Sequence, residues 1–277
     1  MPELPEVETI VRSLRPHLRG AVIRDVAAPG GRLRHPVDVE ALRLACRGQA
    51  IAELRRRAKY ILVELSSGTV LVLHLGMTGA FRVVPSAAPA ATHERVVWIL
   101  EDGRSWRFMD PRRFGSVQVC TSLGADGLPA ALAGLGPEPL EAGFDGEYLY
   151  RRTRGRDRPI KNHIMDQAEV VGVGNIYASE ALFRAGISPR RRCGTLSRKA
   201  LDRLADAIRE VLTEAIAAGG TTIDDFRDVD GSEGHFTTNL QVYGRQGQDC
   251  LRCGRPGGIR RLVQAGRSTY CCPRCQR

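Results

Sequence analysis

The stretch CLRCGRPGGIRRLVQAGRSTYCCPRC, residues 250–275, contains two Cys-x2-Cys pairs. Two such pairs can present four thiolates tetrahedrally to a zinc ion, and the residues between them suit a β-hairpin. Cys250 and Cys253 form the first pair. Only Cys272 has the two-residue spacing to Cys275, so we expect the adjacent Cys271 to be a spare thiol. We therefore predict one structural zinc ion in a small C-terminal unit. The alternative is four unligated cysteines in a tail.

Upstream of this unit, the hydrophobic pattern changes twice. Apolar residues at helical spacing fill residues 5–20, and short alternating or apolar runs separated by SSG and EDG follow from about 21 to 120. This pattern predicts a β-sandwich or barrel preceded by one helix. Residues 132–146 are rich in Gly and Pro and are expected to form a linker. Beyond the linker the period is helical, with Ser197 and Asn175 expected to begin two helices.

Charge indicates the class of partner. The 277-residue chain carries a formal net charge of +10 and has a pI of about 9.6, which favours a polyanion such as nucleic acid. Among 41 basic residues only Lys59, Lys161 and Lys199 are lysines, so Lys59 and Lys161 are candidates for places where a guanidinium does not substitute. Lys199 is expected on an exposed helical face, as an ordinary surface residue. Without a basic-then-apolar leader or a long apolar run, we expect a soluble, cytoplasmic and nucleoid-associated protein with no membrane contact.

The first residues, MPELPEVE, raise a chemical question. Removal of the initiator methionine would leave Pro2 as a free secondary amine, with Glu3 beside it and Glu6 one helical turn away. The neutral form of such an amine is appreciably populated near neutral pH. The stretch can be an acidic helix start or a nucleophile with acids at hand.

Several long motifs together carry a family resemblance. They are MPELPEVE, RRAKY, HLGMTG, DPRRFG, LGPEPL, VVGVGNIYASEALFRAGI, GGTT, QVYGR and the terminal cysteines. With these motifs the chain resembles the bacterial formamidopyrimidine-DNA glycosylases over essentially its whole length. The resemblance implies an α+β multidomain fold with an N-terminal helix-flanked β-sandwich (1–131), a linker (132–146), a helix–two-turn–helix domain (147–240) and a C-terminal zinc finger with four cysteine ligands (241–277).

The resemblance also implies a covalent mechanism. Pro2 would attack C1′ of the damaged nucleotide, and the resulting iminium ion would permit β- and then δ-elimination of the phosphates. Glu3 would supply general acid and base help. Glu6 is a weaker candidate that could instead favour the helix N-terminus or face solvent.

Further residues match the family's binding and catalytic set. Lys59 and Arg267 join Pro2 and Glu3 as catalytic-site residues, with Lys59 near the reacting sugar or a flanking phosphate and Arg267 gripping phosphate from the zinc finger. For Lys59 the alternative is a solvated charge at the edge of a strand. DNA contacts are expected from the side chains of Lys161, Asn175, His74, Met77, Arg112, Phe114 and Glu180.

Three of these contacts have a physical reason. An enzyme acting on a base in duplex DNA must evert the nucleotide and fill the gap. Phe114 would insert between base steps, and Met77 would occupy the space left in the base stack. Arg112 would form hydrogen bonds with the partner base that is left unpaired. The glycine-rich approach to Asn175 suits phosphate at a helix start, although an ordinary helix cap would look the same. For His74 the alternative is a core histidine, as it is core packing for Met77 and Phe114.

The sequence thus predicts a monomeric DNA glycosylase/AP lyase of base excision repair that excises oxidised purines from damaged double-stranded DNA. An endonuclease VIII-like enzyme for oxidised pyrimidines is the nearest alternative. Leu4 and the segment DDFRDVDGSEGHF (224–236), which resembles a loop covering everted 8-oxoguanine, favour purines. A non-catalytic zinc-dependent nucleic-acid binder would bind DNA without a covalent intermediate.

Overall fold

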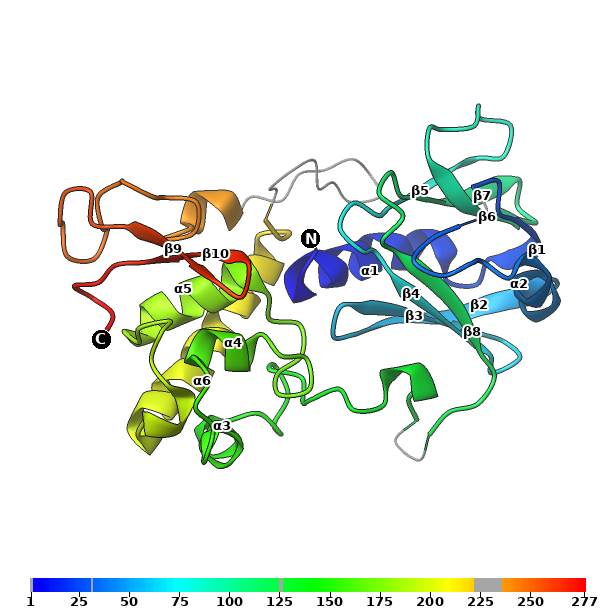
Figure 1. Cartoon of the computed structure of the whole chain (residues 1–277). Helices are drawn as coiled ribbons and strands as arrows, with labels where there is room; N and C mark the ends of the chain where they lie inside the picture. Colours follow the sequence, from blue (N-terminus) through cyan, green and yellow to red (C-terminus); the bar gives the residue numbers. More distant parts are fainter. Residues whose placement is uncertain (1, 31, 125–126, 222–235) are drawn as a thin grey trace. The chain divides into compact units, whose positions relative to one another are not determined.

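The computed structural model describes residues 2–30, 32–124, 127–221 and 236–277 (Figure 1). The described chain divides into two compact units. The first comprises the residues up to Ala133 together with Thr221, and the second comprises Gly134–Gly220 and the described residues from Phe236 onward.

The first unit begins with helix α1 (Leu4–Leu18), as the sequence predicted. Glu3 is its N-cap, and Pro5 lies in the first turn, where its missing N–H is no loss. The helix ends at Arg19, and Gly20 then adopts a left-handed backbone with φ of 82°. One face of the helix is buried in the core, through the apolar side chains of Val7, Ile10, Val11, Leu14 and Leu18.

A fully antiparallel sheet follows the helix, with the described strands in the order β5-β7-β6-β1-β2-β3-β4-β8. The strands are β1 (Val22–Ala27), β2 (Gln49–Arg57), β3 (Tyr60–Leu65), β4 (Val70–His74), β5 (Ala80–Pro85), β6 (Glu94–Leu100), β7 (Arg104–Met109) and β8 (Ser116–Cys120). Strands β1 and β2 share only two paired positions, so the sheet separates into two four-stranded halves. Both halves contribute to one hydrophobic core, as expected of a β-sandwich.

Three details of this unit differ from the sequence prediction. A second helix, α2 (Val39–Cys46), follows β1 and begins at Asp38, whose carboxylate accepts the Ala41 N–H at 2.9 Å. Strand β5 was not predicted. Residues 50–65 form two strands rather than one run, because the chain reverses at Ala58, where φ is 56°.

The second unit contains helices α3 (Gly146–Thr153), α4 (Ile160–Ile164), α5 (Asn175–Ala185) and α6 (Arg198–Ala217), with a hairpin of β9 (Arg260–Gln264) and β10 (Arg267–Cys271). Short 3-10 turns occur at Ala130–Leu132, Cys193–Thr195 and Phe236–Asn239. Ser197 caps α6, as predicted, by accepting the Ala200 N–H. The prediction for α5 was wrong in one respect: Gly174 is its N-cap, and Asn175 is its first helical residue.

Helix α5 is central to the second unit, where it packs against α4, α6 and β10. Nearly all of its residues are buried, and it ends at Gly186 with φ of 72°. Because α5 contacts both α4 and β10, residues from α4, α5 and the hairpin lie beside one another. No helix in the described part of the chain is both long enough and apolar enough to cross a membrane.

Candidate active site and zinc site

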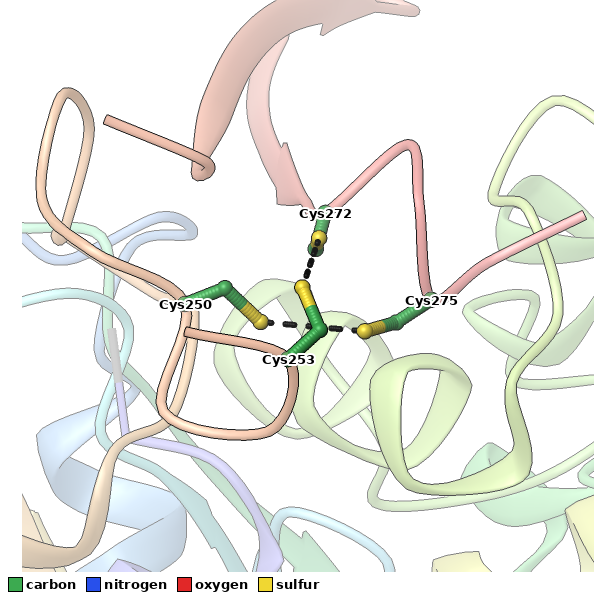
Figure 2. Close-up of side chains that lie close together, drawn as sticks. All are labelled: Cys250, Cys253, Cys272 and Cys275. Carbon is green, nitrogen blue, oxygen red and sulfur yellow. Dashed lines mark hydrogen bonds between the residues drawn. The ribbon is translucent and has the colours of Figure 1, made fainter. Parts of the chain in front are cut away.

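Four cysteines gather at the base of the β9–β10 hairpin (Figure 2). The Sγ atoms of Cys250, Cys253, Cys272 and Cys275 all lie within 4.8 Å of one another. Cys250 and Cys275 are 3.7 Å apart and Cys253 and Cys272 are 3.8 Å apart, too far for a disulfide. Tetrahedral Zn–S bonds of about 2.3 Å would place sulfurs about 3.8 Å apart. The cluster therefore fits one structural zinc ion.

The zinc cluster is continuous with the core of its unit. Cys250 and Cys272 are buried against Phe183 of α5. The Arg252 guanidinium lies 4.3 Å from the Phe183 ring centroid and donates to the Phe183 carbonyl at 2.8 Å. Cys271, predicted to be a spare thiol, is not in the cluster, and burial raises its pKa.

At the amino end of α1, the buried carboxylate of Glu6 orders the backbone at Glu3, one of the predicted catalytic residues. Glu3 is 2% exposed, and its backbone N–H donates to Glu6 Oε2 at 2.8 Å. The other oxygen of Glu6 accepts the backbone N–H of Thr221 at 2.9 Å. Glu6 itself is 3% exposed, so it does not face solvent, which was one of the two alternatives for it. Pro2, which directly precedes Glu3 in the chain, is only partly buried.

Lys59 and His74 form a second part of the site in the first unit. Lys59 is 7% exposed, in the turn before β3, and is therefore not a solvated charge. Burial lowers the pKa of His74 to about 4, and the positive charges of Arg34 and Lys59 act in the same direction. The Gly76 N–H donates to His74 Nδ1 at 2.9 Å, so neutral His74 carries its proton on Nε2. His74 can thus donate a hydrogen bond to a phosphate without being charged.

The predicted insertion residues lie on two turns that touch. Met77 is 40% exposed and Phe114 is 42% exposed, so neither is a core residue. The Arg112 guanidinium carbon lies 5.0 Å from the Phe114 ring centroid. A Cβ at Gly76 would lie 2.4 Å from the Phe114 backbone carbon, so only glycine permits this approach.

A buried aspartate holds the two turns together. Asp110 is fully buried, and its Oδ1 accepts the Thr78 hydroxyl at 2.8 Å and the Arg112 N–H at 3.2 Å. Its Oδ2 accepts the Gly115 N–H at 2.8 Å. Asp110 therefore orders the backbone on both sides of Phe114, although the exposed side chains themselves stay available.

In the second unit, Lys161 joins α4, α5 and β10. It is 1% exposed, and its Nζ donates to Asn175 Oδ1 at 2.5 Å and to Thr269 Oγ1 at 2.6 Å. The Asn175 amide donates in turn to the Ser268 carbonyl at 2.9 Å. The Asn175 side chain therefore bonds across elements instead of capping its helix. Arg267, which precedes Ser268, is exposed at the start of β10.

Glu180, which we predicted to contact DNA, lies on α5 and bonds to the backbone of its own unit. It is fully buried on α5, and its carboxylate accepts the backbone N–H groups of Gln241, Val242 and Tyr243 at 2.8–2.9 Å. Burial raises its pKa, and the three donors act in the opposite direction. Glu180 thus anchors the chain that leads into the zinc-binding unit.

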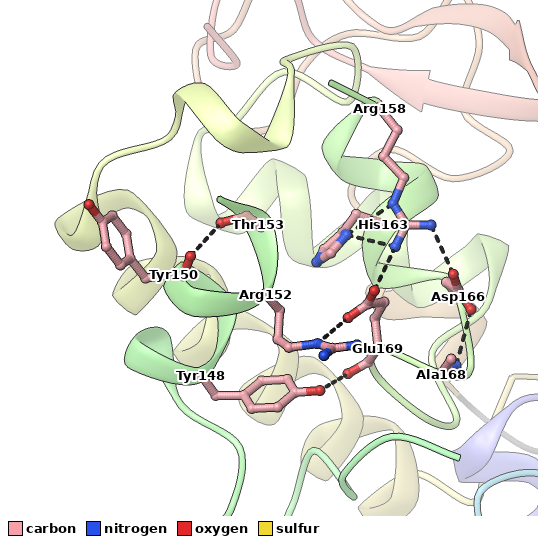
Figure 3. A network of polar contacts seen from close by, with 9 residues as sticks. All are labelled: Tyr148, Tyr150, Arg152, Thr153, Arg158, His163, Asp166, Ala168 and Glu169. Atoms are coloured by element: carbon pink, nitrogen blue, oxygen red, sulfur yellow. Dashed lines mark hydrogen bonds and ion pairs between the residues drawn. The ribbon is translucent and has the colours of Figure 1, made fainter. Parts of the chain in front are cut away.

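A polar network fixes α4 from its other side (Figure 3). The Arg158 guanidinium donates to His163 Nδ1 at 3.0 Å and to Asp166 at 2.8 Å, and also contacts Glu169 at 3.1 Å. Burial and the Arg158 charge lower the pKa of His163 to about 4. Arg152 donates to the second oxygen of Glu169 at 2.7 Å. Because His163 lies two residues after Lys161, this network holds the helix that carries the buried lysine.

Comparisons with known proteins identify the family. The formamidopyrimidine-DNA glycosylase N-terminal domain model matches residues 1–117, its H2TH domain model matches 135–227, and the model of a zinc finger found in FPG and IleRS matches 247–277. The formamidopyrimidine-DNA glycosylase of Stenotrophomonas maltophilia strain K279a is 49% identical over 277 residues and covers all of both chains. The chain belongs to the formamidopyrimidine-DNA glycosylase family.

Solved structures agree with this assignment. The MutM (Fpg) protein of Thermus thermophilus is 42% identical, with a TM-score of 0.85 over 99% of this chain and 98% of that one. A MutM structure in complex with DNA containing carbocyclic 8-oxo-G is 31% identical, with a TM-score of 0.88 and full coverage of both chains. As a formamidopyrimidine-DNA glycosylase, the chain is a DNA repair glycosylase with AP lyase activity that acts on oxidised purines.

Sequence reasoning about this glycosylase missed the residues that position others. Glu6 was ranked low, although its spacing of three from Glu3 is a helix-capping signal. Nothing in the sequence linked Thr269 to Lys161, because the two are 108 residues apart. The segment predicted to cover the lesion lies, apart from Phe236, outside the described residues.

Proposed function

We propose that Pro2 is the nucleophile of this glycosylase and that Glu3 is its general acid and base. The observation that carries the proposal is the burial of Glu3 beside a partly exposed Pro2, with its backbone held by Glu6. A buried carboxyl group next to a secondary amine can exchange protons with it and with the departing base. The proposal requires removal of Met1.

The proposed reaction exchanges one bond at C1′ for another. The lone pair of the Pro2 nitrogen forms a bond to C1′ as the N-glycosidic bond breaks, and the base leaves with the electron pair of the broken bond and takes up a proton. The Pro2 nitrogen loses its proton, and the C1′–O4′ bond then breaks as O4′ takes up a proton. The opened sugar is thus joined to Pro2 as an iminium ion, which withdraws electrons from C2′–H. Loss of the C2′ proton expels the 3′ phosphate, and loss of the C4′ proton then expels the 5′ phosphate.

Phosphate contacts are proposed for both units. In the first, His74 would donate from its neutral Nε2–H, with Lys59 supplying positive charge nearby. In the second, Arg267 would contact phosphate directly. We assign Lys161, which is buried, the role of holding Asn175 and β10 in place for that contact.

We also propose that Met77, Arg112 and Phe114 fill the gap left by the everted nucleotide. Their exposure and their position on two packed turns support this role, since exposed apolar side chains on an ordered loop can enter a base stack without losing core packing. The working form would be a cytoplasmic monomer bound to damaged duplex DNA, in a compartment where thiols stay reduced for zinc.

Borohydride trapping on a duplex containing 8-oxoguanine opposite cytosine tests the nucleophile. Wild-type protein should form a covalent adduct that peptide mapping places on Pro2, and Pro2→Gly should lose most of it. Glu3→Gln should trap far more slowly, whereas Glu101→Gln, an exposed carboxylate of the same unit, should behave as wild type. An adduct mapped to a lysine would overturn the proposal, and so would a wild-type chain that is active with Met1 retained.

A further inference from the structure

Four arginines line a cavity of about 450 Å³ beside the zinc-binding hairpin. They are Arg190, Arg255, Arg260 and Arg261, and all four are exposed. The remaining lining comes from Leu262, Cys271 and Pro273. None of the residues proposed above to contact DNA lines this cavity.

Three separate segments bring these arginines together. Arg190 follows α5, Arg255 lies in the turn after the first Cys-x2-Cys pair, and Arg260 and Arg261 are consecutive on β9. The turn is tight: a Cβ at Gly258 would lie 2.7 Å from the Arg255 carbonyl oxygen. Cys250 and Ile259, on either side of this turn, pack with Phe183 of α5 and so hold the backbone from which Arg255 and Arg260 extend.

Within the described residues, none of the four guanidinium groups has an ion-pair partner. Within the same described residues, the one hydrogen bond that these four guanidinium groups make runs from Arg261 to the neutral Ser268 hydroxyl at 2.9 Å. Some other arginines of the same unit are ion-paired, as Arg184 is with Glu214 at 2.6 Å. Like charges around one cavity repel, by about 1 kcal/mol for a pair 4 Å apart in water, and an anion in the cavity would relieve that repulsion.

We propose that this cavity is a phosphate-binding site, additional to the contacts assigned to Arg267 and His74. Guanidinium forks match the oxygens of a phosphate and bind it with two parallel hydrogen bonds. The lining has no aromatic ring on which a base could stack and no carboxylate to receive an amine. The occupant is either a backbone phosphate of the bound duplex or a small phosphorylated molecule. The site does not depend on the identity of the nucleophile.

Two charge-matched double variants test the proposal. Arg255→Gln/Arg260→Gln removes two charges from the cavity, and Arg151→Gln/Arg156→Gln removes two exposed charges elsewhere in the unit. The first measurement is the salt dependence of binding to a 30-base-pair duplex with a tetrahydrofuran abasic analogue. Each lost phosphate contact should reduce the slope of log K against log salt by about 0.9. The second measurement follows arginine Nε–H resonances by NMR during titration with pyrophosphate at constant ionic strength.

Each outcome decides the question. A shallower slope in the cavity variant but not in the control identifies a DNA phosphate as the occupant. Pyrophosphate shifts that saturate in the wild type and vanish in the cavity variant identify a small phosphorylated ligand. Equal slopes for all three proteins without saturable shifts overturn the proposal, as does a control that loses as much as the cavity variant. Zinc content of one ion per chain in both variants establishes that they are folded, and Arg190→Gln/Arg261→Gln repeats the test.

Discussion

At the scale of single residues, the Glu6 carboxylate decides how the amino terminus is ordered. It accepts one N–H from Glu3 and one from Thr221, and both bonds are buried. Glu6→Gln keeps the size of the side chain but leaves a single acceptor oxygen for two donors. We expect a loss of about 1–3 kcal/mol in the free energy of unfolding, because a buried N–H is left unpaired.

The same substitution should slow trapping with borohydride, since Glu3 would lose its fixed backbone. Chemical denaturation and single-turnover trapping measure the two effects, with Glu101→Gln as the matched control. A Glu6→Gln protein of wild-type stability and trapping rate would contradict this account of the amino terminus.

His74 has a strongly altered ionisation. Its pKa of about 4 lies below the ordinary value of 6.5, so the folded state binds its proton less well than the unfolded state does. The stability that it contributes is therefore complete above pH 6.5 and is lost as the pH falls toward 4. We expect the His74 ring resonances to titrate near pH 4 and to report the Nε2–H tautomer at pH 7.

The neutral donor has a consequence for DNA binding that can be separated from charge. His74→Gln should weaken binding to abasic-site DNA only a few-fold and leave the salt slope unchanged, since no charge is lost. A shallower slope in this variant would mean that His74 is a cation when DNA is bound, and a titration midpoint near 6.5 would contradict the lowered pKa.

At the scale of elements, β10 connects the zinc hairpin to α4 and α5. Thr269 is fully buried and accepts from the Lys161 ammonium. Thr269→Val removes that acceptor from a buried cation, and we expect a loss of about 1–3 kcal/mol in the free energy of unfolding together with weaker DNA binding. Thr269→Ser keeps the hydroxyl and should retain most of both properties. Equal behaviour of the valine and serine variants in denaturation and binding assays would contradict this role.

The elements that the sequence predicted well are those with local signals. Helix α1 has a capping residue, a proline in its first turn and an apolar face. The cysteine pairs have the Cys-x2-Cys spacing that is typical of zinc sites. Helix α2 is only eight residues long, and strand β5 lies where Gly and Pro interrupt the alternation, so both were missed.

Contacts between distant residues could not be predicted in the same way. The bonds of Lys161 to Thr269 and of Glu6 to Thr221 depend on the tertiary fold, so composition and periodicity give no sign of them. Asn175 was read as a helix cap because its residue type allows it, whereas the fold turns its side chain toward Ser268. The domain boundaries at 131, 146 and 240, and the roles of the site residues, stay predictions.

At the scale of the whole molecule, zinc should matter for affinity although it takes no part in the chemistry. The metal would fix the strands that carry Arg267 and the acceptors of Lys161. Removal of zinc by a chelator, or Cys272→Ser, should therefore reduce affinity for abasic-site DNA by at least tenfold and unfold the hairpin. Fluorescence anisotropy and zinc content measure this, and Cys271→Ser, outside the cluster, is the matched control. Unchanged affinity of the zinc-free protein would contradict the coupling.

One hydrogen bond of Glu6 connects positions 215 residues apart, because its partner is Thr221. Thr221 lies three residues before the stretch 224–236, which we predicted to cover the damaged base. In the proposed mechanism, recognition of the damaged base and cleavage of its bond thus both depend on the hydrogen bonds of the Glu6 carboxylate. Directed evolution toward new lesions should accordingly find few tolerated changes at position 221. Substitutions within residues 224–236 should preserve turnover more often than substitutions at Thr221.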